Sequence, residues 1–99
     1  MPDLRLSVAA RTDLSDIWLD TFDRWGEDQA DTYLDDIDKA LRRLLDNPRM
    51  GKDCSDLLPG ARRLITGRHL VFYEVTESAI FVLRVLHQSM DVPRHLSRP

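Results

Sequence analysis

The stretch "LLPGARRLITGRHLVFYEVTESAIFVLRVLH", residues 57–87, carries the strongest signal of secondary structure in the sequence. It holds three runs rich in β-branched and aromatic residues, "ARRLIT", "HLVFYEV" and "AIFVLRVLH", separated by the turn candidates "TGR" and "TES". Three short strands in succession predict an antiparallel meander. The third run is apolar at nearly every position, which is typical of a strand that is central or covered on both faces.

Upstream of this stretch, two amphipathic helices are expected. Apolar residues recur at steps of three and four in both segments: Leu14, Ile17, Trp18, Phe22 and Trp25, then Ala30, Tyr33, Leu34, Ile37, Leu41, Leu44 and Leu45. Ser7 or Thr12 can cap the first helix, and Gly26 ends it. Asn47 and Pro48 end the second. The short link predicts an antiparallel hairpin that must bury its apolar stripes on something flat.

The N-terminal segment "DLRLSV", residues 3–8, alternates apolar and polar side chains, which predicts a half-buried strand that joins the sheet. Residues 47–60 are expected to be a loop. The complete prediction is a single α+β domain over residues 1–99. It has an N-terminal strand, and an antiparallel two-helix hairpin that packs on a C-terminal three-stranded antiparallel meander.

Composition restricts the classes of function. The chain has 99 residues, 42% of them hydrophobic and 31% charged, and a net charge of −3. No segment resembles a signal peptide or a membrane span, and the lone Cys54 has no disulfide partner, so we expect a cytoplasmic protein that does not enter a membrane. Residues 1–46 carry twelve acidic against six basic side chains. This acidity argues against sequence-specific binding to nucleic acid.

Motifs for phosphate loops, dinucleotide folds, zinc proteases and nucleophile elbows are missing from the sequence. Asp31, Asp35 and Asp38 share one face of the second helix, but no histidine accompanies them, so we interpret that face as solvated. Cys54 lies in "GKDCSDL" without a nearby histidine that would lower the pKa of its thiol. We therefore predict no metal, no cofactor and no catalytic residue.

Trp18, Phe22 and Trp25 form an aromatic ridge on the first helix. The sequence leaves two interpretations of this ridge open. It packs against the sheet as core, or part of it stays wet and forms a groove wall for a partner, a setting in which tryptophan is favoured.

A second candidate site is the end of the last strand, where "VLRVLHQSMDVPRHL", residues 82–96, gathers Arg84, His87 and Arg94. Cations beside an imidazole suit a ribonuclease or a surface that docks a target. The plainer interpretation is structural: His87 bonds to Asp91 or to a backbone carbonyl, and the cluster holds the tail on the sheet.

The ordered series "LSVAARTDLSDIW", "WGEDQADTYLDDIDKAL", "LLDNPRMG", "LLPGARRLITGRHLVFYEV" and "VLRVLHQSMDVPRHL" resembles the ParE toxins of the RelE/ParE superfamily, from bacterial type II toxin–antitoxin modules. The resemblance covers nearly the whole chain. It implies the same order of elements, a ParD-like antitoxin in a hetero-oligomeric complex, and DNA gyrase as the target. Relatives in the RelE branch cleave ribosome-bound mRNA with cationic side chains and often a Tyr or His near the C-terminus.

This chain departs from the RelE pattern, because no tyrosine follows Tyr73 and the chain as a whole is acidic. The leading hypothesis is a non-enzymatic gyrase inhibitor that binds its antitoxin through Trp18, Phe22 and Trp25 and its target through Arg84, His87 and Arg94. Two alternatives stay open: a ribosome-dependent endoribonuclease, and a toxin-like fold that retains antitoxin binding alone.

Overall fold

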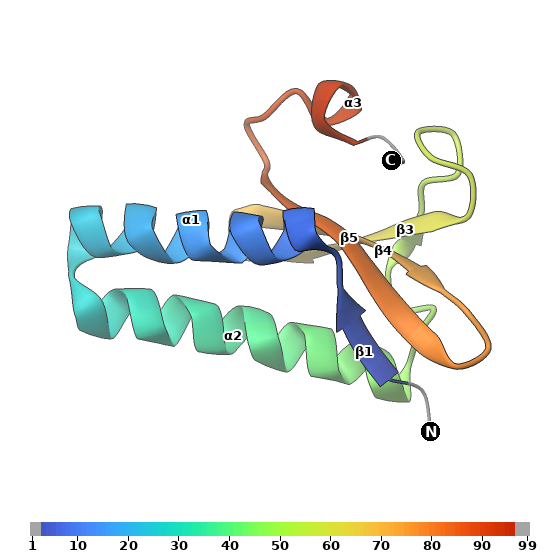
Figure 1. Cartoon of the computed structure of the whole chain (residues 1–99), viewed down its shortest axis with the longest axis horizontal. Coiled ribbons are helices and arrows are strands. Elements are labelled where there is room, and N and C mark those ends of the chain that lie inside the picture. The colour runs from blue at the N-terminus through green and yellow to red at the C-terminus, as the bar shows by residue number, and fades with distance from the viewer. Residues whose placement is uncertain (1–2, 97–99) are drawn as a thin grey trace.

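A computed structural model describes residues 3–96 of the chain (Figure 1). Its elements in order are β1 (Asp3–Leu6), α1 (Val8–Trp25), α2 (Glu27–Asp46), β2 (Lys52–Asp53), β3 (Ala61–Thr66), β4 (His69–Val75), β5 (Ala79–His87) and α3 (Val92–His95). The expected α+β order of strand, helical hairpin and meander is confirmed. None of the helices within residues 3–96 is long and apolar enough to cross a membrane.

The five strands form one mixed sheet in the order β1-β5-β4-β3-β2. The meander β3–β4–β5 is antiparallel, and β1 lies parallel to β5 with Leu4 opposite Ile80. The expected N-terminal strand therefore does join the sheet. The expectation of a plain loop over residues 47–60 is wrong at β2, which pairs with Arg62 and Arg63 of β3. Two residues are too short to show alternation, so the sequence carries no signal for this strand.

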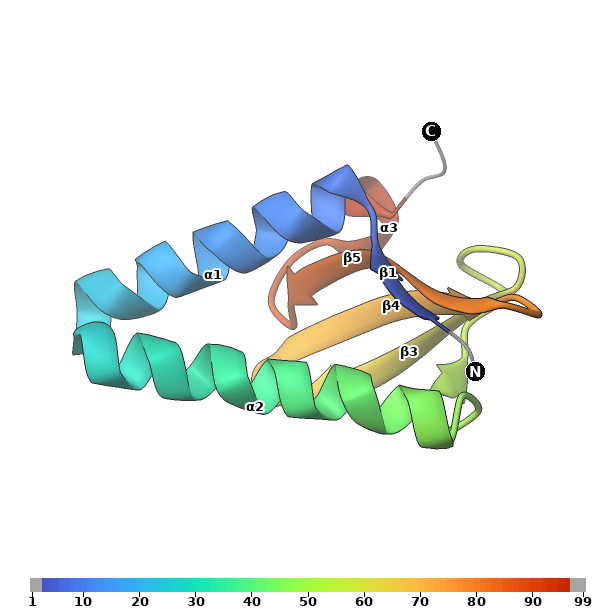
Figure 2. The ribbon, with the colours of Figure 1, turned by 60° about the horizontal axis from the view of Figure 1, so that its bottom comes forward.

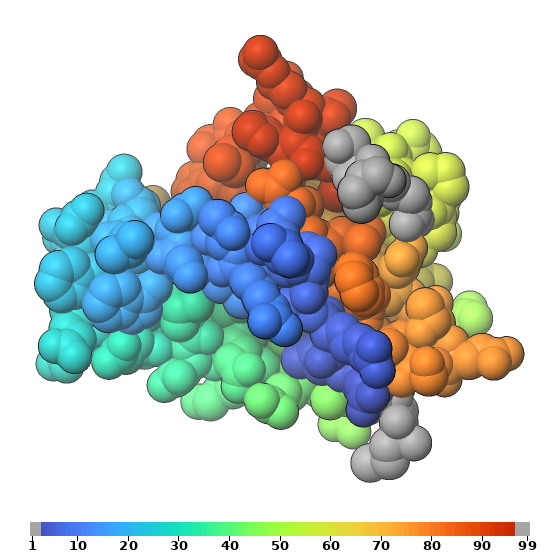
Figure 3. Space-filling model, viewed as in Figure 1, coloured from blue at the N-terminus to red at the C-terminus, as the bar shows by residue number. Residues whose placement is uncertain are grey.

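The two long helices form the antiparallel hairpin that the sequence predicts. The Ser7 side chain caps α1 by accepting a hydrogen bond from the backbone N–H of Ala10 at 2.9 Å. Gly26, with φ of +90°, ends α1 and allows the chain to reverse at once into α2. The helices diverge from this turn and cover one face of the sheet (Figure 2). In the space-filling view, α1, α2 and β1 form a continuous outer face (Figure 3).

The sheet is covered on both faces, by two separate cores. The helical hairpin packs on one core, which includes Ile37, Leu44, Val71, Tyr73 and Ile80. A smaller core on other sheet residues contains Cys54, Leu58, Phe72, Leu86 and Leu96. The strand β5 contributes to both cores and lies between β1 and β4, which explains its nearly continuous apolar sequence.

The C-terminal segment is more ordered than the sequence suggests. We expected a short tail after the last strand, whereas the structure has a turn and then the one-turn helix α3 with Pro93 in its first turn. Val92 and Leu96 anchor this segment in the smaller core. A single helical turn has too few residues to show the periodicity by which helices are found in sequences.

Candidate functional site: an exposed aromatic ridge and a histidine cavity

The aromatic ridge is not part of the core. Trp18 is half-buried, but Phe22 and Trp25 keep 42% and 74% of their surface exposed. The rings of Trp18 and Phe22 stack at 5.2 Å between centroids, and the Trp18 Nε1–H donates to Asp31 of α2 at 2.9 Å. The core interpretation is therefore wrong for Phe22 and Trp25. Stacking and the indole hydrogen bond fix an apolar surface that faces water, as interfaces for partners do.

A second exposed apolar surface lies at the edge of β3. The short β2 covers β3 only at Arg62 and Arg63, so the strand continues beyond its partner. Ile65 on this uncovered part is 66% exposed. Between it and α2 lies a hollow of about 330 Å³ that is lined by Met50, Lys39 and Arg43, among others. An uncovered strand edge beside a groove is a geometry that accepts an extended peptide.

Arg84 is partly buried, and its guanidinium is engaged by other parts of the chain. Its Nε and Nη2 donate to the two carboxylate oxygens of Asp13 on α1, both at 2.8 Å, and its Nη1 donates to the His95 carbonyl at 2.9 Å. These hydrogen bonds to Asp13 raise the pKa of the Arg84 guanidinium. The structural interpretation of this arginine, that it holds the C-terminal tail on the sheet, is confirmed.

His87 has a different partner from those we expected. Its Nδ1 lies 2.7 Å from the Ser89 Oγ and accepts the Ser89 backbone N–H at 3.1 Å, so the expectation of Asp91 or a backbone carbonyl is wrong. The physical reason is a turn that is closed by a hydrogen bond from the Met90 N–H to the His87 carbonyl. This turn places Ser89 beside the His87 ring, and Asp91 follows after the turn.

Arg84, His87 and Arg94 do not share one site. Arg94 is exposed on α3, Arg84 is paired with Asp13, and of the three only His87 lines the cavity described next.

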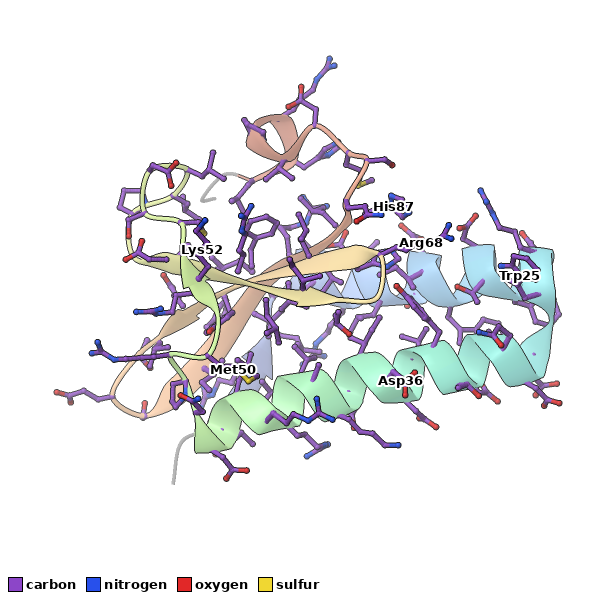
Figure 4. The ribbon with its side chains drawn as sticks, turned by 180° about the vertical axis from the view of Figure 1, so that it is seen from behind. Trp25, Asp36, Met50, Lys52, Arg68 and His87 are labelled. Atoms are coloured by element: carbon purple, nitrogen blue, oxygen red, sulfur yellow. The ribbon has the colours of Figure 1, made fainter. Side chains whose placement is uncertain are left out.

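The cavity lies between the helical hairpin and the turn from β3 to β4, and has a volume of about 400 Å³. Tyr33 of α2, His69 of β4 and His87 of β5 line it, with Arg68 and Trp25 at its walls. Tyr33 Oη lies 2.5 Å from His69 Nδ1, and the rings of His69 and His87 meet edge to face with centroids 5.1 Å apart. In Figure 4, Arg68 and His87 lie together at the strand ends, with Trp25 nearer the hairpin turn. We call this the histidine cavity.

The protonation state of His69 follows from its surroundings. Burial is the main cause that lowers its pKa from 6.5 to about 4, and the neighbouring His87 adds to the effect. His69 is therefore neutral at pH 7. Tyr33 Oη accepts the Arg68 backbone N–H at 3.1 Å and is also hydrogen-bonded to His69 Nδ1.

In the part of the chain that the structure describes, the cysteine and the carboxylates outside the histidine cavity form neither a metal site nor an activated nucleophile. Within residues 3–96, no group of three His, Cys, Asp or Glu side chains is placed to hold a metal ion. Cys54 is buried in the smaller core, and burial raises the pKa of its thiol, so it stays protonated and weakly nucleophilic at neutral pH. The exposed Asp31 and Asp38 bond to Trp18 and Arg42, and Asp35 is exposed, as expected of a solvated helical face.

The histidine cavity was absent from the sequence analysis, although part of it was predictable. In an antiparallel hairpin the first residue of one strand faces the last residue of the next, and His69 does pair with His87. Tyr33 gave no such signal, because a residue in an apolar helical stripe is predicted to pack in the core. Tyr33 does pack against the larger core, and it lines the cavity as well. Asp13 gave none either, since one acid among twelve in the first half of the chain is inconspicuous.

Comparisons with known proteins agree with this fold. In structure, the chain resembles one from the "Chromosomal ParDE TA system from P. aeruginosa", with a TM-score of 0.77, 22% identity, and coverage of 88% of this chain and 96% of that one. This likeness shows that the two chains share a fold. In sequence, residues 4–92 match the family described as "ParE toxin of type II toxin-antitoxin system, parDE".

Curated relatives match along almost their whole length. "Toxin ParE1" of Mycobacterium tuberculosis is 51% identical over 92 residues, which are 92% of this chain and 94% of that protein. "Toxin ParE1" of Caulobacter vibrioides is 40% identical over 96 residues, covering 97% and 99%. "Toxin ParE" of Escherichia coli is 31% identical over 94 residues, covering 93% and 90%. The chain belongs to the ParE toxin family of type II toxin–antitoxin systems.

Proposed function

We propose that this toxin acts by inhibiting DNA gyrase in the cytoplasm, and that a ParD-like antitoxin neutralises it by binding. The observation that supports this most is the match to ParE relatives over nearly the full chain, since the ParE resemblance implies gyrase as the target. The related P. aeruginosa structure is described as a ParDE system, which supports a ParD-like partner for this chain as well.

We place the antitoxin on the two exposed apolar surfaces. A partner helix suits the aromatic ridge, because Phe22 and Trp25 are already exposed to solvent and the Trp18 ring is held in place by its hydrogen bond to Asp31. An extended partner segment suits the uncovered edge of β3 at Ile65. The hollow beside it is lined by Lys39 and Arg43 against the single acid Asp36, and this excess of positive charge favours acidic residues in that segment. Burial of these side chains provides the apolar contact area on which such affinity mainly depends.

The endoribonuclease alternative loses its proposed cations. Arg84 is engaged by Asp13 and His95, and Arg94 stands apart on α3, so neither is positioned with His87 to stabilise a phosphate in a transition state. We therefore assign Arg84 a structural role. His87 lines an open cavity, and its hydrogen-bond partner Ser89 is exposed. We therefore keep His87 as the proposed contact with the target.

Controlled expression in bacteria tests the proposed function. We expect growth arrest with induction of the DNA damage response, and recovery when the ParD-like antitoxin is expressed together with the toxin. Arrest of translation with cleaved mRNA and no DNA damage response would instead identify a ribonuclease. Normal growth without the antitoxin would leave antitoxin binding as the retained activity.

A further inference from the structure

The histidine cavity has imidazole nitrogens that make no hydrogen bond to another described residue. The Ser89 backbone N–H donates to His87 Nδ1, so Nδ1 is an acceptor and the ring N–H of His87 is at Nε2. Tyr33 Oη accepts the Arg68 N–H and is hydrogen-bonded to His69 Nδ1, so Nε2 is the ring nitrogen of His69 that makes no hydrogen bond to another described residue. The Nε2 atoms of two histidines from neighbouring strand ends are therefore available for a ligand in one cavity, each as a donor when it carries the ring proton.

The charge of the cavity wall favours an anion. The Arg68 side chain lines the cavity and is exposed, with no ion pair to another described residue. Asp20 also lines the wall, but it pairs with Arg24 at 3.4 Å, so one guanidinium remains in excess. A guanidinium beside N–H donors is a common arrangement for binding phosphate oxygens.

The volume of the cavity and its aromatic wall favour a ligand that is larger than a single phosphate ion. A volume of about 400 Å³ lies within the range of small-molecule sites and exceeds what a single phosphate fills. Trp25 lines the same cavity, and its indole is 74% exposed. A flat exposed indole offers a surface on which a nucleobase stacks.

We propose that the histidine cavity binds a nucleoside monophosphate unit. The phosphoryl oxygens accept hydrogen bonds from the Nε2–H groups of His69 and His87 and pair with Arg68. The base stacks on Trp25. This unit is either a free nucleotide or one residue of a single-stranded nucleic acid, and it is read without sequence preference because any base offers a π-face.

Titrations followed by imidazole NMR signals and by calorimetry test this site. The probes are inorganic phosphate, AMP and a short oligothymidylate. We expect AMP to shift the signals of His69 and His87 and to bind several-fold more tightly than phosphate, since stacking adds affinity. Tighter binding of the oligothymidylate than of AMP identifies a strand as the source, and the reverse identifies a free nucleotide.

Variants distinguish a specific binding site from nonspecific electrostatic attraction to the protein surface. Arg68→Gln should weaken AMP and phosphate roughly ten-fold, as loss of a charge-assisted contact does. Trp25→Ala should weaken AMP but not phosphate. Arg94→Gln, which removes an exposed cation outside the cavity, is the matched control and should change neither. Unshifted histidine signals with every probe, or equal losses in Arg68→Gln and Arg94→Gln, would overturn the proposal.

Discussion

Asp13 and Arg84 form a two-point ion pair that connects the first helix to the last strand. Both carboxylate oxygens accept from the guanidinium at 2.8 Å, and one of them also accepts the Val85 backbone N–H at 2.9 Å. The strand β1 pairs with β5 only as far as Val82, so Asp13 takes the place of a strand partner further along β5. Through the His95 carbonyl, the same arginine also holds α3.

Removal of this ion pair should destabilise the fold. Asp13→Asn leaves a largely buried guanidinium with a weaker acceptor, and we expect a loss of about 2–3 kcal/mol in the free energy of unfolding, measured by urea denaturation. Asp38→Asn is the matched control, because its pair with Arg42 is exposed and should contribute less than about 0.5 kcal/mol. Equal effects of the two substitutions would show that the Asp13 pair is not structural.

His69 predicts a specific dependence of stability on pH. Its folded-state pKa of about 4 lies below the unfolded value of 6.5, so the unfolded chain binds this proton more readily. The contribution is therefore fully present above about pH 6.5 and is lost as the pH falls toward 4. Because the ring is half-exposed, we expect only about 1–2 kcal/mol.

The comparison of wild type with His69→Gln isolates this effect from other titrating groups. Asp20, Tyr33, Arg68 and His87 all lie around the same cavity and remain in both proteins. The difference in unfolding free energy between the two proteins should shrink as the pH falls from 7 to 4. A difference that stays constant over this range would contradict the low pKa of His69.

Gly51 should not tolerate a side chain. A Cβ at this position would lie 2.5 Å from Tyr73 Oη and 2.7 Å from the Arg63 carbonyl oxygen. The Tyr73 hydroxyl is buried there, donating to the Pro48 carbonyl and accepting the Gly51 N–H. We expect Gly51→Ala to cost about 2–4 kcal/mol in thermal or urea unfolding. Gly60→Ala, where φ is +81° but no atom lies within 4 Å, should cost about 1 kcal/mol.

The elements of this fold were largely predictable because their signals are local and repeated. Helical stripes, the cap at Ser7, the reversal at Gly26 and the three runs after Gly60 each follow from periodicity or turn chemistry. The short elements β2 and α3 were not predictable, since they depend on pairing with distant residues. For the same reason, the sequence placed Arg84 in a site but could not reveal that Asp13, 71 positions away, engages it.

Antitoxin binding should depend on the exposed aromatics. Phe22→Ala together with Trp25→Ala removes the ridge residues that stand in water, and we expect the affinity for the ParD-like antitoxin to fall at least about ten-fold by calorimetry. Val8→Ala is the control, because Val8 is exposed at the opposite end of the same helix. Unchanged affinity in the double variant would remove the ridge from the interface.

The gyrase inhibition that we propose for this ParE-family chain can be tested by a supercoiling assay with purified components. Relaxed plasmid, ATP, gyrase and the purified chain are combined, with and without the ParD-like antitoxin. We expect the chain to block supercoiling and to cause gyrase–DNA cleavage complexes to accumulate, and we expect the antitoxin to restore supercoiling. Full supercoiling with no cleavage complexes, at concentrations where the same preparation binds its antitoxin, would contradict it.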